Sequence, residues 1–201
     1  NATKYYKDIA TFLKIDPSER RINNYVRNVH PGSNALESQP NIVLVICESF
    51  SMYKSSMSGN PLNSTPYFNE LSNQGIFFER CFSPSFGTAR GVFAIITGTP
   101  DVQLSKFATR NEETVNQRTI INDFEGYEKF YFIGGRSQFN NFNGLIKNIK
   151  GVKIYEEGSY ASPKMNVWGI SDKNLFLEST IFPLLHCLLR LYELILHSLI
   201  H

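Results

Sequence analysis

The stretch that decides the fold runs from residue 41 to residue 49 and reads NIVLVICES. It contains five consecutive apolar residues, Ile42 to Ile46, most of them β-branched. Such a run after Pro40 predicts a strand that is buried on both faces, as strands of parallel sheets are. Glu48 follows directly, which places a carboxylate at the carboxyl end of the strand, where open α/β sheets bind ligands. That carboxylate is either solvated at the sheet edge or a metal ligand.

The segments after this strand alternate between helix and strand patterns. One helix is predicted from Pro66 to Gly75, because Thr-Pro and glycine are start and stop signals. Further helices are predicted at about 88–96, 117–124 and 139–151 and after Ser171–Asp172, and strands at 76–83, 129–135 and 152–157. The alternation predicts an α/β fold with a mostly parallel sheet flanked by helices.

The two ends of the chain differ from this central part. Residues 1–40 are polar and irregular, apart from a predicted helix at 5–13, and are interpreted as a linker or a surface-packed lead-in. The domain itself is assigned to residues 41–180. Residues 181–201 form a leucine-rich tail with charged residues inside it, which favours a buried or amphipathic helix over a membrane span. Because no signal peptide opens the sequence, we expect the chain to begin within a longer protein or after processing.

The composition excludes several classes of protein. Hydrophobic residues make up 42% of the 201 residues and charged residues 19%, which is enough apolar material for a packed core. The net charge is only +2, without a basic cluster, so nucleic acid is not an expected partner. The three cysteines form no CxxC pair, which argues against a thiolate metal site or a disulfide framework.

Residues 85–98 read SFGTARGVFAIITG and place Thr88 at the start of an apolar helix. A helix N-terminus presents free N–H groups and the positive end of the helix dipole, and so attracts anions. The Thr88 hydroxyl there either caps the helix or attacks a phosphate held by the same N–H groups. Arg90 either contacts that phosphate through its planar, charged group or is simply exposed to solvent. Taken singly, Thr88 is better explained as a helix cap and Arg90 as a solvent-exposed side chain.

Five segments in a fixed order change this balance. They read PNIVLVICES, TPYFNELSNQGIFFERCF, GTARG, FIGGRSQFNNFNG and WGISDKNLF, and the first begins at Pro40 and the last ends at Phe176. Together they resemble the lipoteichoic acid synthase and phosphoglycerol transferase family, a sulfatase-like branch of the alkaline phosphatase superfamily. The resemblance implies an alkaline-phosphatase-like α/β sheet. It also implies that Thr88 is the nucleophile and that Glu48 and Thr88 bind a divalent metal.

The resemblance further implies a reaction. A phosphoglycerol-type group would pass from a membrane phospholipid or glycolipid to an acceptor through a phospho-threonine at Thr88. The metal would be manganese, magnesium or zinc, and oxygen ligands favour the first two. Arg90, Trp168 and Asn140 are the candidate substrate-binding residues, although a core anchor also explains Trp168 and a turn also explains Asn140.

The resemblance also predicts a location. Enzymes of this family work at the cytoplasmic membrane, with the catalytic domain on its extracytoplasmic face. Their membrane anchor is a set of N-terminal spans that this sequence does not contain, so the membrane would be a partner only through them.

Two departures from the family pattern shape the remaining expectations. The segment CFSPSFG does not match the sulfatase nucleophile pattern, and no Asp-His pair follows Asp172. We therefore expect the N-terminal part of a catalytic domain, incomplete at its C-terminus, that binds metal weakly and is inactive by itself. Its open sheet edge would be covered by the tail or by self-association. A sulfatase- or phosphatase-type hydrolase and a non-catalytic domain fragment remain as alternatives.

Overall fold

The computed structural model describes residues 6–14, 40–102, 108–186 and 193–198. The chain divides into two compact units, Asn1–Pro40 and Asn41–His201. In the first unit, helix α1 (Tyr6–Leu13) lies where the sequence predicts a helix.

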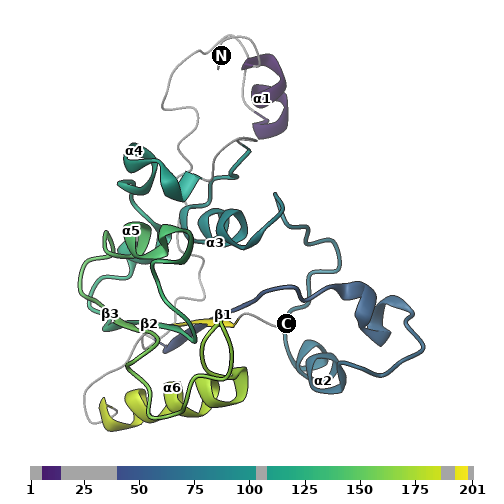
Figure 1. The fold of residues 1–201 in the computed structure, drawn as a ribbon. Coiled ribbons are helices and arrows are strands. Elements are labelled where there is room, and N and C mark those ends of the chain that lie inside the picture. Colours follow the sequence, from purple (N-terminus) through teal and green to yellow (C-terminus); the bar gives the residue numbers. More distant parts are fainter. Residues whose placement is uncertain (1–5, 15–39, 103–107, 187–192, 199–201) are drawn as a thin grey trace. The chain divides into compact units, whose positions relative to one another are not determined.

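The second unit is built on a four-stranded parallel sheet with the strand order β1-β4-β2-β3 (Figure 1). Its strands are β1 (Ile42–Cys47), β2 (Lys129–Ile133), β3 (Val152–Tyr155) and β4 (Glu193–Ser198). Because every pair is parallel, the carboxyl ends of all four strands lie along one edge of the sheet. The predicted α/β class with a parallel sheet is confirmed.

Helices cover both faces of this sheet. Figure 1 shows α6 on one face and α3 and α5 on the other. The α-helices of this unit are α2 (Pro66–Gln74), α3 (Thr88–Thr97), α4 (Glu112–Val115), α5 (Phe142–Ile146) and α6 (Asp172–His186). Short 3-10 turns occupy Met52–Lys54, Ser56–Ser58, Ala108–Arg110, Ile120–Asp123 and Phe139–Asn141. The predicted boundaries of α2 and α3 are confirmed to within one residue.

Strand β2 carries the core on both of its faces, because successive side chains of a strand point to opposite sides. Tyr131 and Ile133 pack with the buried apolar side chains of α3 and α5. Phe130 and Phe132 pack with Leu175 of α6. All five residues of β2 are buried.

Three predictions about secondary structure are wrong. Residues 76–83 form no strand, and Phe78 and Phe82 are 73% and 82% exposed. The helix predicted at 117–124 is only the 3-10 turn Ile120–Asp123. Strand β1 is not buried on both faces, since Val43 is 57% exposed. The reason is its place at the margin of the described sheet, where α6 packs against β4 and β2 instead.

The leucine-rich tail also differs from its prediction. Helix α6 continues from Asp172 to His186, but residues Glu193–Ser198 form strand β4 instead of more helix. This strand lies inside the sheet, between β1 and β2, and does not cover an outer edge. A short apolar run fits a helix or a strand equally well by pattern, and backbone pairing on two sides decides for the strand.

Candidate functional site

Glu48 and Thr88 meet at the carboxyl edge of the sheet. The Thr88 hydroxyl donates a hydrogen bond of 2.8 Å to Oε2 of Glu48, and both side chains are half-buried. Glu48 follows the last residue of β1, and Thr88 is the first residue of α3. The structure therefore brings together the two residues that the resemblance pairs. The roles of nucleophile and metal ligand stay predictions.

Thr88 does not cap its helix. The capping position is Gly87, whose carbonyl accepts hydrogen bonds from the backbone N–H groups of Arg90 and Gly91. Gly87 has φ 81° and ψ 144°, a conformation that side chains rarely tolerate, so glycine is the residue that allows this turn. Because the helix does not use the Thr88 hydroxyl, that hydroxyl is available to Glu48.

A cavity of about 300 Å³ opens beside this pair. It is rich in small polar side chains and backbone, and its lining consists of Cys47, Glu48, Ser49, Phe50, Ser51, Ser83, Ser85, Gly87 and Gly91. Ser49 has a φ of 55°, in the left-handed region that residues other than glycine seldom occupy. Such backbone strain is often found at functional sites, where the surrounding structure holds it in place.

Arg90 is buried, so the reading as a solvent-exposed arginine is wrong. Its Nε lies 3.8 Å from Oδ2 of Asp101, and both side chains are nearly inaccessible, at 3% and 2% exposed. The guanidinium carbon also lies 4.6 Å from the ring centre of Phe86. Asp101 in turn accepts a hydrogen bond of 2.8 Å from the backbone N–H of Ala108. The first turn of α3 is thereby tied to the segment that follows the helix, and a phosphate contact of Arg90 stays a prediction.

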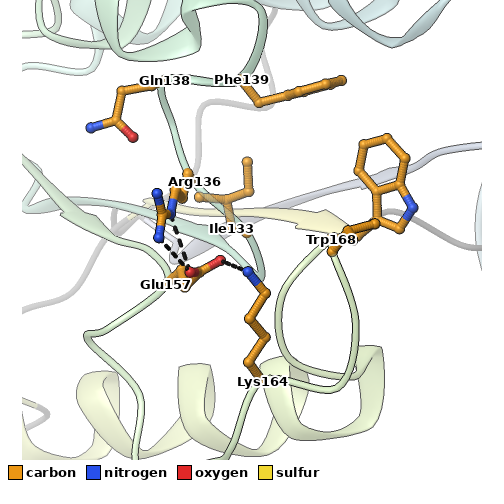
Figure 2. Close-up of a pocket in the computed structure, with 9 residues that line it drawn as sticks. Ile133, Arg136, Gln138, Phe139, Glu157, Lys164 and Trp168 are labelled. Carbon is orange, nitrogen blue, oxygen red and sulfur yellow. Dashed lines mark hydrogen bonds and ion pairs between the residues drawn. The ribbon is translucent and has the colours of Figure 1, made fainter.

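A second cavity, of about 690 Å³, lies at the carboxyl ends of β2 and β3 (Figure 2). Its lining residues end β2, follow β2 or lie between β3 and α6, and they are Ile133, Gly135, Arg136, Gln138, Phe139, Glu157, Lys164, Val167 and Trp168. The Trp168 ring stands edge to face with that of Phe139, with centres 5.4 Å apart. Trp168 thus lines a cavity, as the prediction of a substrate-binding role requires. Its contact with substrate stays a prediction.

Close backbone approach explains the Gly-Gly and Trp-Gly pairs of the sequence. A Cβ atom on Gly135 would lie 2.6 Å from the carbonyl oxygen of Trp168. A Cβ on Gly169 would overlap the carbonyl of Gly134, and Gly169 has φ 115°. The N–H of Ile170 donates a bond of 3.1 Å to the same carbonyl of Gly134. The two segments therefore lie against each other, and this contact sets the position of Trp168.

Three charged side chains form one wall of the second cavity. Arg136 donates from Nε and Nη2 to Oε1 of Glu157, at 3.1 Å and 3.0 Å. Lys164 donates to Oε2 of the same carboxylate at 2.9 Å. The hydrogen bond from Lys164, followed by the bond and charge of Arg136, holds the pKa of Glu157 below its usual range. Near neutral pH this group of three carries a net charge of +1.

Asn140 lies at neither cavity. Its side-chain oxygen accepts a hydrogen bond of 3.2 Å from Arg110, and its φ of 50° is left-handed. Asparagine is one of the few residues that adopts this conformation readily, so the structure supports a turn role. Substrate binding by Asn140 stays a prediction.

The fold agrees with a comparison to known families. The sulfatase family model matches residues 40–182, which is more than half of the chain. The chain belongs to the sulfatase family. No curated protein matches it significantly.

One solved structure places this sulfatase-family domain in a wider group. A protein in the alkaline phosphatase superfamily from Vibrio parahaemolyticus superposes with a TM-score of 0.67 at 25% sequence identity. The match covers 79% of this chain and 40% of that protein. The predicted alkaline-phosphatase-type fold is confirmed, and the chain spans less than half the length of this relative. Within the described residues, no helix is long and apolar enough to cross a membrane.

Domains of this family typically depend on a metal ion. The described residues supply only some of the ligands that such an ion needs. Glu48 and Thr88 supply two neighbouring oxygen atoms, which suit a hard divalent ion. Such an ion takes about six oxygen ligands. Among the described residues, no group of three or more His, Cys, Asp or Glu side chains comes together. Glu48 and Thr88 would therefore hold only one side of the ion.

The sequence reasoning missed the charged wall of the second cavity. Arg136 comes just after the predicted strand 129–135, and Glu157 falls within the predicted strand 152–157, which in fact ends at Tyr155. A strand that ends at Tyr155 leaves Glu157 shortly after β3, much as Glu48 follows β1. Lys164 lies in a loop and carries no such signal.

Proposed function

We propose that this sulfatase-family domain contributes the nucleophile of a metal-dependent transferase that moves a phosphoglycerol-type group. The donor is a membrane phospholipid or glycolipid on the extracytoplasmic face of the cytoplasmic membrane, and the acceptor is another alcohol. The observation that carries the proposal is the 2.8 Å hydrogen bond between Thr88 and Glu48 at the start of α3. Free backbone N–H groups at this helix start favour an anionic phosphate beside the hydroxyl.

The reaction has two balanced steps. Thr88 Oγ1 forms a bond to phosphorus while the bond from phosphorus to the lipid alcohol breaks, and that alcohol takes up the proton that Thr88 loses. The acceptor alcohol then forms its bond to phosphorus while the Thr88 oxygen leaves and regains a proton.

The groups in the site divide the work of these steps. Glu48 orients the Thr88 hydroxyl for the first step, because it accepts the hydrogen bond of that hydroxyl. A divalent ion, when bound, lowers the pKa of the hydroxyl and offsets the charge of the phosphate.

The decisive experiment uses the full-length protein with donor lipid in vesicles. Thr88→Ala is expected to lower transfer by at least about a thousandfold, because it removes the nucleophile. Thr88→Ser keeps a hydroxyl and is expected to retain measurable activity. Mass spectrometry of the trapped protein should show the phosphorylated adduct on the peptide that contains Thr88. A folded Thr88→Ala protein with near-normal transfer would overturn the proposal.

A hydrolase is the second candidate, and the match to the sulfatase family favours it. In that case water would take the place of the acceptor alcohol. Product analysis with and without added glycerol separates the two, because a transferase needs the alcohol for turnover and a hydrolase releases phosphate or sulfate without it.

A further inference from the structure

The second cavity has two chemically different walls. Figure 2 shows Trp168 and Phe139 on one side and Arg136, Glu157 and Lys164 on the other. Pockets that fix the orientation of a ligand combine an apolar surface with a few placed polar groups. A ligand that fits both walls needs a compact ring-like body and an anionic substituent.

The charged wall has hydrogen-bond donors that Glu157 does not use and that an anion can accept. Glu157 accepts two N–H groups of Arg136 and one of Lys164. A guanidinium has five N–H donors and an ammonium has three, so each cation keeps donors beyond those that Glu157 uses. Arg136 and Lys164 are also accessible, with side chains 69% and 46% exposed. The excess charge of +1 and the remaining donors favour an oxyanion.

The aromatic wall is held in place and offers a flat surface. Trp168 is fixed by the close contact of its backbone with Gly135 and by the edge-to-face contact with Phe139. Gln138 also lines the cavity, with its amide on the side of Arg136 and away from the Phe139 ring, and an amide can bond to hydroxyl groups. A ring with an apolar face and hydroxyls around its edge matches this combination.

The sheet topology places this cavity close to the Thr88–Glu48 pair. Glu48 follows β1 and the cavity begins at the end of β2, on the same edge of a parallel sheet. Only β4 separates β1 from β2. Neighbouring strands are about 4.8 Å apart, so the two strand ends lie roughly 10 Å apart. One substrate of about two sugar units can reach both places.

We propose that the cavity formed by Arg136, Lys164 and Trp168 binds a sugar ring that carries a phosphate or sulfate group. The ring lies against Trp168, and the oxyanion accepts hydrogen bonds from Arg136 and Lys164. This inference rests on the proposed function in one respect, because it assigns the cavity to the part of the donor or acceptor that does not react.

The single tryptophan of the chain provides a direct test. The full chain is titrated with glucose 6-phosphate and glucose 6-sulfate while Trp168 fluorescence is recorded, with calorimetry as a second measurement. A saturable change in fluorescence is expected for at least one of the two sugars. The ratio of their two dissociation constants tells whether the cavity prefers phosphate or sulfate. Methyl glucoside and inorganic phosphate are each expected to bind about tenfold more weakly, since each satisfies one wall only. Equal binding of either simple probe, or no heat and no fluorescence change up to about 10 mM, overturns the inference.

Matched variants show whether the binding is at this cavity. Arg136→Met and Lys164→Met are each expected to weaken glucose 6-phosphate about tenfold. Lys153→Met is the control, because Lys153 is equally exposed, at 46%, and paired to Glu128 outside the cavity. If all three variants bind alike, the assigned residues are wrong.

Thr88→Ala separates this inference from the proposed function. It is expected to bind glucose 6-phosphate like the parent protein. If Thr88→Ala still transfers the phosphoglycerol-type group and still binds the sugar phosphate, only the proposed function is refuted. If Thr88→Ala has lost transfer and neither it nor the parent protein binds an anionic sugar, only this inference is refuted.

Discussion

At the scale of single residues, the burial of Arg90 is the feature with the largest consequence. A charged group this deep is held by its partner, and removing one partner leaves the other uncompensated. The ion pair with Asp101 anchors the first turn of α3, on which Thr88 stands. Arg90 therefore helps to hold the helix turn that positions Thr88, the proposed nucleophile.

Arg90→Met is expected to lower the free energy of unfolding by about 3 kcal/mol, because it strands the Asp101 carboxylate in a buried place. Arg118→Met is the matched control, since Arg118 pairs with Asp123 at the surface, where the two side chains are 69% and 61% exposed. Exposed pairs contribute only about 0–1 kcal/mol. Urea unfolding, monitored by circular dichroism, measures the free energy of unfolding of both variants. Equal, small losses would show that Arg90 is not a structural anchor.

At the scale of elements, the contact between the end of β2 and the loop before α6 shapes the second cavity. Two sequence-distant Gly-containing segments lie backbone to backbone there, without room for side chains. The loop is further held by Glu178 of α6, whose carboxylate accepts the backbone N–H groups of Ala161 and Ser162 at 2.9 Å and 2.7 Å. The place of Trp168 depends on both contacts.

Gly169→Ala tests this contact against a matched glycine. Gly169 has φ 115° and an added Cβ would meet Gly134, whereas Gly158 has φ 100° and nothing within 4 Å of an added Cβ. Both substitutions carry the cost of the backbone conformation, about 1–3 kcal/mol, and only Gly169→Ala adds a clash with backbone. We expect Gly169→Ala to be clearly the more destabilising and to change Trp168 fluorescence. Indistinguishable unfolding curves for the two variants would contradict the close approach of these segments.

At the scale of the whole molecule, the chain contributes two residues to the proposed catalytic centre. The described residues bring Glu48 and Thr88 together without a third metal-binding side chain of the His, Cys, Asp or Glu type. Large apolar side chains also remain exposed near residues 53–86, among them Tyr53, Tyr67 and Phe82. The predicted self-association is consistent with such a surface, and it stays a prediction.

Calorimetric titration of the 201-residue chain with manganese tests the metal expectation. Two oxygen ligands hold a hard ion poorly, so we expect a Kd of about 1 mM or weaker. Glu48→Gln is expected to abolish this weak binding, and Glu70→Gln, an exposed carboxylate on α2, to leave it unchanged. Tight, stoichiometric binding would show that further ligands exist outside the described residues.

The local features of this protein could be predicted from the chain alone. Pro66 and Gly75 delimit α2, Gly98 ends α3, and the β-branched and aromatic runs form β1 and β2. These rules act between residues a few positions apart, so the amino-acid order is enough to apply them. The family resemblance also paired Glu48 with Thr88, and the structure brings the two together although the strand expected before Thr88 is absent.

The long-range features depended on how the whole chain packs. Packing turned residues 193–198 into a strand between β1 and β2, buried Arg90 against Asp101, and left residues 76–83 without a sheet partner. It also joined Arg136, from the segment after β2, with Glu157 and Lys164, from the connection between β3 and α6, into one cavity wall. Each of these outcomes depends on which surfaces pack together and which backbone groups find partners far along the chain. Local propensity carries no information about that choice.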